Sequence, residues 1–337
     1  MTLRNVRKLF LGVFGAFALL LSSCTPRFPI TGWPIDNTAS VHAIGNNGGE
    51  FQQYGGGGPY FHAGLDILED DAPDGPWVRV VRAGNPTLST PGAASLYNGL
   101  TMNLSDGDVY LYWHLDFNSI QQAVRDAETN GTALAANSQV SRLVTWTACS
   151  YHHLHYEISD STGTMDPIYA LTPRNDTTAP IIINVYFTQN ATNTQFPTGA
   201  LGTPILSGNV DVIAHAYDTQ FGTARTGVME LSYWVNNTGG AQVKAPTTIR
   251  FGNIPANSNA SIIFRNSSPF DSDSNYCGTE NYYYVLTNVD ASGNIISDAS
   301  GFWNTTTLAD GVYQVNVKGV DPSGNDFTII KQVNIDN

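Results

Sequence analysis

The chain has 337 residues, 42% of them hydrophobic, which is enough for two domains with a core each. Charged residues make up 13% of the chain, about half of the roughly 25% that is typical of globular domains. The net charge is −13, from 15 basic and 28 acidic residues, and no basic cluster follows the N-terminal segment. Because phosphate binding needs a basic patch, we expect no nucleic-acid partner.

Residues 1–24 have the features of an export leader. A positively charged start precedes an apolar run over residues 9–21, which is too short to span a membrane comfortably as a mature helix. The run ends in Leu21-Ser22-Ser23-Cys24, which resembles a bacterial lipobox with Cys24 as the lipidated first mature residue. We therefore expect a lipoprotein signal peptide and a membrane-anchored protein of the cell envelope. Thr25 favours the outer membrane facing the periplasm, or the cell surface, and an uncleaved membrane anchor is the alternative.

Two further cysteines, Cys149 and Cys277, follow Cys24. In an oxidising compartment they can form one disulfide between domains, but two buried thiols agree equally well with the sequence. Neither belongs to a Cys-x-x-Cys pair, so a cysteine zinc site is not expected.

Residues 25–59 are rich in Pro, Gly and Asn, and this composition predicts a tether that runs into an irregular loop. Shortly after it, His62 and Asp66 lie an even number of residues apart. An extended segment therefore presents both side chains to one side, and Gly64 between them permits a bend or the close approach of another group.

Alternation and turn residues predict a mainly β protein beyond this point. One helix is expected over residues 118–128, with Asn118 as its N-cap. Strands of a first domain are expected at residues 77–82, 96–103, 109–114, 140–146 and 151–158.

The last of these strands carries His153 and His155 on one face, with Leu154 and Tyr156 on the other. Two imidazoles side by side on a strand suit a metal ion, or a metal ligand next to a base. Two surface histidines that share a strand by accident would show the same spacing. The interpretation therefore depends on which other residues reach this strand.

A linker is expected at residues 172–180, and the chain beyond it repeats short strands between turns. The strand, turn and strand over residues 309–325 resemble the last hairpin of immunoglobulin-like or fibronectin-like bacterial surface modules, and we expect one β-sandwich over residues 180–337. It contains no catalytic constellation. Its strands are expected at residues 181–187, 210–217, 229–235, 261–264, 282–286 and 312–320, with a final turn and strand after them.

Five of the seven histidines lie in three clusters before residue 160, namely His62, His114 and the group at 152–155. A catalytic zinc site uses three ligands from His, Asp or Glu and leaves one position for water. His62, Asp66 and one of the paired histidines supply that set. The remaining histidines can flank the water as general base and as stabiliser of the tetrahedral intermediate.

Three motifs occur in this order along the chain: His62-x-x-x-Asp66, Tyr112-x-His114-Leu115 and His153-Leu154-His155-Tyr156-Glu157. Together they resemble the motifs of the M23 (lysostaphin/LytM-type) zinc endopeptidases of bacterial cell walls. The resemblance covers roughly residues 60–170. It implies that His62, Asp66 and His155 hold Zn²⁺, that His153 is the general base, and that His114 orients or stabilises at the same water.

The expected organisation is an antiparallel-sheet M23-like domain at 60–172, which the resemblance implies, followed by the immunoglobulin-like domain at 180–337. The expected function is hydrolysis of peptide cross-links in peptidoglycan, with an envelope protein as a further partner of the C-terminal domain. The glycines that commonly precede His-Leu-His are replaced by residues 146–152, and Tyr54 and Tyr60 are both candidates for the assisting tyrosine of some relatives.

Two alternatives stay open. One is a non-catalytic M23-like regulator or binding module, in which the same metal groove holds a wall peptide or a partner. The other is a 2-His-1-carboxylate iron oxygenase or cupin, but only His215 lies downstream to complete a cupin set.

Overall fold

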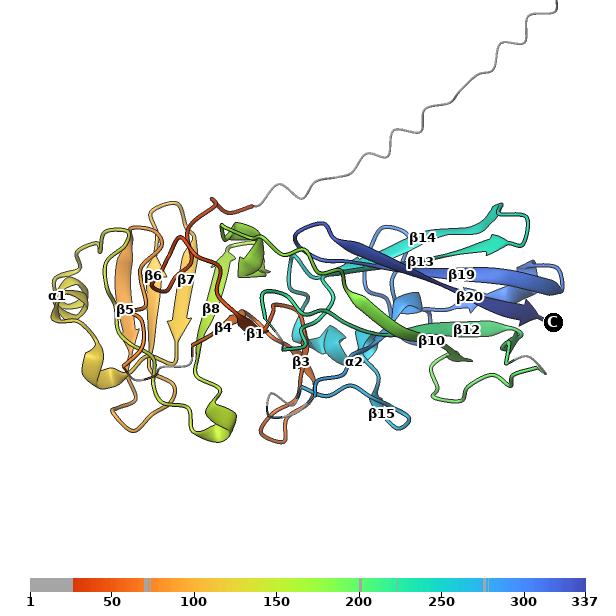
Figure 1. Cartoon of the computed structure of the whole chain (residues 1–337), viewed down its shortest axis with the longest axis horizontal. Helices are drawn as coiled ribbons and strands as arrows, with labels where there is room; N and C mark the ends of the chain where they lie inside the picture. The colour runs from red at the N-terminus through yellow and green to blue at the C-terminus, as the bar shows by residue number, and fades with distance from the viewer. Residues whose placement is uncertain are drawn as a thin grey trace, which may run out of the picture.

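A computed structural model describes residues 27–69, 72, 74–199, 202–222, 224–274, 277 and 279–337. The expected leader and Cys24 lie outside these residues. No helix within them has the length and apolar character needed to cross a membrane. The described chain is mainly β with antiparallel sheets, as predicted, and forms two lobes along the long axis of the molecule (Figure 1).

The first unit is built on an antiparallel sheet that carries the histidine strand in its middle. Its strand order is β1-β4-β8-β7-β6-β5, and β9 pairs with the far end of β8. The bounds are β1 Ile44–Asn46, β4 Leu65–Leu68, β5 Asn85–Ser89, β6 Gly99–Asn103, β7 Val109–Trp113, β8 His153–Asp160 and β9 Gly163–Met165.

Aromatic side chains on one face of this sheet form much of its core. Tyr112 and Tyr156 are paired across β7 and β8, and their ring centroids lie 5.2 Å apart. Both are fully buried, as is Leu154, so the face of β8 opposite the histidines is the core face. The strand alternation predicted for residues 151–158 is therefore observed.

The helix of the first unit begins later than predicted. Helix α1 (Gln122–Asn130) follows Gln121 and ends at Gly131, which has the left-handed conformation of a C-cap. Asn118 is not its N-cap, because a separate 3₁₀ turn, η1 (Phe117–Ser119), precedes it and is capped by Asp116. Residues 77–82 and 140–146, expected as strands, form only isolated bridges, such as Arg79 with Gln139.

The second unit has two β-sheets that enclose one core. One sheet has the order β10-β12-β17, with β18 on β12, and the other has the order β11-β20-β19-β13-β14. The immunoglobulin-like assignment stays a prediction. The bounds are β10 Ile181–Gln189, β11 Ile205–Leu206, β12 Asn209–Tyr217, β13 Glu230–Asn237, β14 Gln242–Arg250, β17 Tyr283–Val285, β18 Trp303–Asn304, β19 Gly311–Val320 and β20 Asp326–Ile335.

Of residues 261–264, expected as a strand, the first three lie instead in helix α2 (Ala260–Ile263), whose buried residues Ala260 and Ile263 face the core, and Phe264 forms an isolated bridge with Tyr284. A short apolar run does not separate strand from helix by its pattern alone. The remaining elements are short: β15 Asn266–Ser267, β16 Phe270–Asp271, η2 Ala148–Ser150, η3 Pro167–Ala170, η4 Asn257–Asn259, η5 Leu286–Asn288 and η6 Thr305–Thr307.

Much of the segment expected as a tether, residues 25–59, is built into the fold where the structure describes it. Trp33 is fully buried in the first core. Phe51, in β2 (Phe51–Gln52), and Phe61, in β3 (Tyr60–Phe61), pack in the core of the second unit. Strand β3 and helix α2 lie where the two lobes meet (Figure 1). Large apolar side chains dispersed among glycines and prolines explain why composition alone predicted a loop.

Polar and covalent contacts also join the two units. Glu50 is buried and accepts hydrogen bonds from the Gly227 backbone at 2.9 Å and from the Tyr282 hydroxyl at 2.8 Å. Cys149 and Cys277 form a disulfide between the loop before β8 and the second unit. The loop before β8 is thereby covalently bonded to the second unit.

Replacing Phe51 by alanine tests whether this segment holds the units together. Phe51 is 1% exposed, and its ring lies 5.5 Å from that of Phe264. We expect the free energy of unfolding to fall by about 3–5 kcal/mol, as for other large buried aromatic truncations. Denaturant unfolding measures this, with the exposed Val312→Ala as control. A change below about 0.5 kcal/mol, the usual range for surface positions, would contradict this packing.

Candidate metal centre

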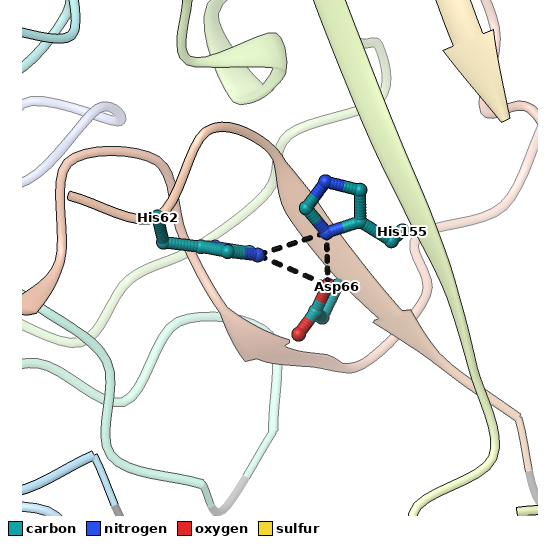
Figure 2. Close-up of side chains that lie close together, drawn as sticks. All are labelled: His62, Asp66 and His155. Carbon is teal, nitrogen blue, oxygen red and sulfur yellow. Dashed lines mark hydrogen bonds and ion pairs between the residues drawn. The ribbon is translucent and has the colours of Figure 1, made fainter. Parts of the chain in front are cut away.

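Three predicted ligands meet at the junction of β4 and β8. Asp66 lies directly opposite His155 in the antiparallel register, and His62 follows β3. The Nδ1 atom of His155 lies 2.9 Å from Asp66 Oδ1 and 2.9 Å from His62 Nε2, and His62 Nε2 lies 3.2 Å from Asp66 Oδ1. Figure 2 shows the three side chains converging from separate segments.

Gly64 allows this close approach. A Cβ atom at position 64 would lie 2.5 Å from the Tyr156 carbonyl oxygen and 3.0 Å from His155 Nε2. Both distances are too short for a side chain, so only glycine lets the 62–66 segment lie directly on β8. The role expected for Gly64 from the sequence is therefore observed.

Second partners orient the two histidines of this triad. His62 Nδ1 lies 3.0 Å from the Asn47 carbonyl oxygen, and His155 Nε2 lies 2.9 Å from Glu157 Oε1. These acceptors leave His62 Nε2 and His155 Nδ1 facing Asp66. Hydrogen-bonded outer partners of this kind hold ligand histidines in one tautomer and orientation.

His114 and His153 stand beside the triad as a pair. Their ring centroids lie 4.4 Å apart, and His153 Nε2 lies 3.8 Å from Asp66 Oδ1. Each Nδ1 donates to a backbone carbonyl at 2.8 Å, from Leu96 for His114 and from Tyr151 for His153. In each neutral ring the lone pair is then on Nε2.

His114 also has a strained backbone. Its φ is +69°, in the left-handed region that residues with a side chain rarely adopt. Such strain persists only where surrounding structure enforces it, and it concentrates at functional sites. The sequence shows no sign of this conformation.

The pKa shifts separate the five residues into two groups. Burial alone would raise the Asp66 pKa, but His62 and His153 together with hydrogen bonds from the triad histidines hold it well below its usual value. Burial opposes the charged form of His155, yet hydrogen bonds to Asp66 and Glu157 raise its pKa to about 9. The triad thus favours a positive charge beside an ionised carboxylate.

The pKa values of His114 and His153 are shifted in the opposite direction, downwards. Burial, followed by the charge of His153, lowers the pKa of His114 to about 3. Burial is also the main reason that the pKa of His153 is lowered. Both imidazoles are therefore neutral near pH 7, with free lone pairs next to the triad.

A groove of about 660 Å³ opens over the five residues. Its walls are largely aromatic, and one polar residue, Asn257, comes from the second unit. Tyr54, a candidate for the assisting tyrosine, lines it and is tied by its hydroxyl to the Ser274 carbonyl oxygen. The aromatic wall residues are Tyr54, Tyr60, Phe61, Tyr97, Trp113, Trp146 and Tyr151.

Four residues at the site were missed by the sequence prediction. The Tyr151 hydroxyl lies 2.6 Å from Asn46 Oδ1 and 3.2 Å from Asp66 Oδ2, so Tyr151 contacts the carboxylate and Asn46 positions that hydroxyl. Glu157 was detectable, because it lies two residues beyond His155 on the same face of the strand. Asn46 and Asn257 carry no sequence signal, since only the fold brings them to the groove.

Comparisons with known proteins found distant structural likenesses. The catalytic domain of the antimicrobial peptidase lysostaphin from Staphylococcus simulans, crystallised in the absence of phosphate, is 17% identical, with 38% of this chain and 90% of that chain covered and a TM-score of 0.29. An NMR solution structure of lysostaphin is 12% identical over 78% of this chain and 94% of that one, with a TM-score of 0.30.

A structure of the SpoIIQ–SpoIIIAH pore forming complex is 13% identical, with 42% of this chain and 91% of that chain covered and a TM-score of 0.28. The sequence matches no protein-family model, and a search among curated proteins found no match. Likenesses this distant assign no activity, so any function has to be argued from the geometry of the groove itself.

Proposed function

We propose that the protein is a zinc-dependent endopeptidase that hydrolyses peptide cross-links of bacterial peptidoglycan. The observation that carries this proposal is the convergence of His62, Asp66 and His155 within 3.2 Å of one another, beside two neutral histidines, at the base of a groove. Export and a lipid anchor on Cys24 belong to the same proposal and rest on the sequence of the leader.

The residues present fit zinc. Two imidazole nitrogens and one carboxylate oxygen are a donor set that zinc prefers, and three protein ligands leave a coordination position for water or substrate. The donor atoms of the set lie within 4.8 Å of one another, close enough to share one ion. Outer partners on both histidines, at Asn47 and Glu157, complete the arrangement.

Zinc bound there would polarise the scissile carbonyl and lower the pKa of a water molecule toward about 7. His153 accepts a proton from the attacking water, because its Nε2 lone pair faces the triad and its Nδ1 is engaged by Tyr151. The protonated imidazole then returns that proton to the departing amine. His114, 4.4 Å from His153 between ring centroids, accepts a hydrogen bond from the same water with its Nε2 lone pair and so orients it.

The groove fits an extended peptide better than a small molecule. It lies along the sheet face, is bounded by flat aromatic rings, and is completed by Asn257 from the second unit. Aromatic walls supply contact area, and a few polar groups orient the backbone of the substrate. The second unit is therefore proposed to contribute to the wall of the substrate site and to serve as a contact for envelope partners.

Digestion of purified peptidoglycan tests the proposal directly. The full chain is incubated with peptidoglycan as purified, after chelation, and after zinc is restored, and the new termini are identified by mass spectrometry. We expect new peptide amino termini that disappear on chelation and return with zinc. A zinc-loaded protein that cleaves no muropeptide across a panel would instead indicate a non-catalytic binding module, and iron as the bound metal would indicate an oxygenase.

Glu157→Ala is expected to weaken zinc binding by about 10- to 100-fold, the usual cost of removing an outer partner of a ligand histidine. The side chain accepts from His155 Nε2 at 2.9 Å and so keeps Nδ1 toward the triad. Competition with a chromogenic chelator measures the affinity. Glu157→Gln, which keeps an oxygen acceptor, is the matched control, and its zinc affinity should fall less than that of Glu157→Ala. Equal affinities for the parent chain and the alanine variant would show that Glu157 does not orient the ligand.

A further inference from the structure

A second cluster of carboxylates lies far from the groove. Asp176 belongs to the linker, Asp218 follows β12, and Asp321 follows β19. One carboxylate oxygen of each lies within 4.8 Å of the others. Asp218 is 1% exposed and Asp321 is 5% exposed, so bulk water does little to screen their charges.

Several polar atoms around this cluster have no partner among the described residues. They include Oδ2 of Asp176, Oδ2 of Asp218 and both amide atoms of Gln220. Gln220 is fully buried, and its side chain approaches the Asp218 carboxylate closely enough to lower the pKa of that group. Buried polar groups nearly always have partners, so the unsatisfied carboxylate oxygens of Asp176 and Asp218 indicate a missing cation.

The three carboxylates repel one another without such a cation. Their oxygens lie within 4.8 Å of one another and two of the three side chains are buried, so little water separates the charges. No arginine, lysine or histidine forms an ion pair with any of the three among the described residues.

We propose that Asp176, Asp218 and Asp321 bind a calcium ion, with the buried side-chain amide of Gln220 beside the site. Three oxygens at most 4.8 Å apart share a point about 2.8 Å or less from each, so shifts of a few tenths of an ångström bring them to the calcium–oxygen distance of about 2.3–2.6 Å. The donors are oxygens only, which favours a hard cation over zinc. Calcium tolerates the irregular, carboxylate-rich arrangement better than magnesium, which requires near-octahedral ligands and retains its waters.

The position of the site gives the ion a structural role. Asn325, in the turn after Asp321, donates to the Asp176 carbonyl oxygen at 3.0 Å and so holds the linker on the second unit. The segment that carries Asp218 and Gln220 continues to Phe221, whose ring lies 6.0 Å from that of Trp33 in the first unit. Calcium at this point ties the linker, the second unit and the surface of the first unit together.

The chain supplies a matched control loop. Asp290 is the first residue of Asp-Ala-Ser-Gly-Asn, and Asp321 is the first residue of the similar Asp-Pro-Ser-Gly-Asn. In each loop the aspartate carboxylate accepts hydrogen bonds from the backbone N–H groups of the following Ser and Asn and from the Asn side chain. The Asn294 hydrogen bonds lower the pKa of Asp290, whereas that of Asp321 is raised. The two loops share their geometry and differ in the neighbouring carboxylates.

The test measures thermal unfolding of the full chain, stripped of all metals and then supplied with calcium. With about 10 mM Ca²⁺, and a dissociation constant of about 0.1–1 mM as in other extracellular modules, Tm should rise by about 3–8 °C. Asp218→Asn should lose this shift, and Asp290→Asn should keep it. Calorimetric titration with CaCl₂ should show one site in the parent chain and none in Asp218→Asn.

Asp218→Asn keeps the shape of the side chain and removes one repelling charge, so without calcium it should unfold at the same temperature as the parent chain or higher. If that variant does not fold, Asp176→Asn takes its place, because it also removes one of the three carboxylates and keeps the shape of the side chain. No calcium-dependent shift in the parent chain, or an equal shift in the substituted chain, would overturn the proposal. A shift with Mg²⁺ and none with Ca²⁺ would overturn the choice of ion. None of these readings depends on peptidase activity.

Discussion

Asp66→Ala is expected to abolish both zinc binding and peptidoglycan cleavage. Asp66 supplies the only carboxylate of the triad and lies within 3.2 Å of both ligand nitrogens. Its ionised form is also what holds His62 and His155 toward a common point, since both histidine pKa values are raised by it. Loss of an outer partner costs about 10- to 100-fold in metal affinity, so loss of a ligand should cost more than about 100-fold.

Zinc content after dialysis against a zinc buffer, measured by atomic emission, gives the first reading, and release of muropeptides gives the second. Circular dichroism shows whether the variant remains folded, because Asp66 is buried between β1 and β8. His155→Ala should behave in the same way. A folded Asp66→Ala chain that retains stoichiometric zinc and cleaves peptidoglycan would remove the basis of the proposed centre.

His153→Ala is expected to keep zinc and lose hydrolysis. Its Nε2 is 3.8 Å from Asp66 Oδ1, outside the 2.9–3.2 Å contacts of the triad, so it stands next to the ligands rather than among them. Removal of a general base lowers the rate by about 10²- to 10⁴-fold. The cleavage rate and the zinc stoichiometry, measured on the same preparation, separate this role from that of a ligand.

His215→Ala provides the control for this prediction. His215 also lies on a strand and is 9% exposed, but it stacks on Tyr283 in the second unit, away from the groove. Its removal should leave the cleavage rate unchanged. Undiminished hydrolysis by His153→Ala would refute the role of that histidine as the base, whereas loss of zinc in the variant would make it a ligand instead.

Local periodicity determined much of the site in advance. Side chains two apart on a strand share a face, so His153 and His155 had to project together, with Leu154 and Tyr156 on the opposite, buried face. His62 and Asp66 also converge, but residues 62–64 lie between β3 and β4, so the even spacing alone does not account for it. Strand boundaries were less predictable, as residues 77–82 and 140–146 show, because bridge formation depends on distant partners.

Only the tertiary structure decided how these local units meet. The register that sets Asp66 opposite His155 joins residues 89 positions apart, and nothing in either segment specifies it. The same holds for the disulfide between Cys149 and Cys277, and for the aspartates at 176, 218 and 321, which lie in separate segments of the chain. Sequence patterns encode which way a side chain points along its own strand, but the long-range packing of apolar residues such as Phe51 and Phe61 determines what it points at.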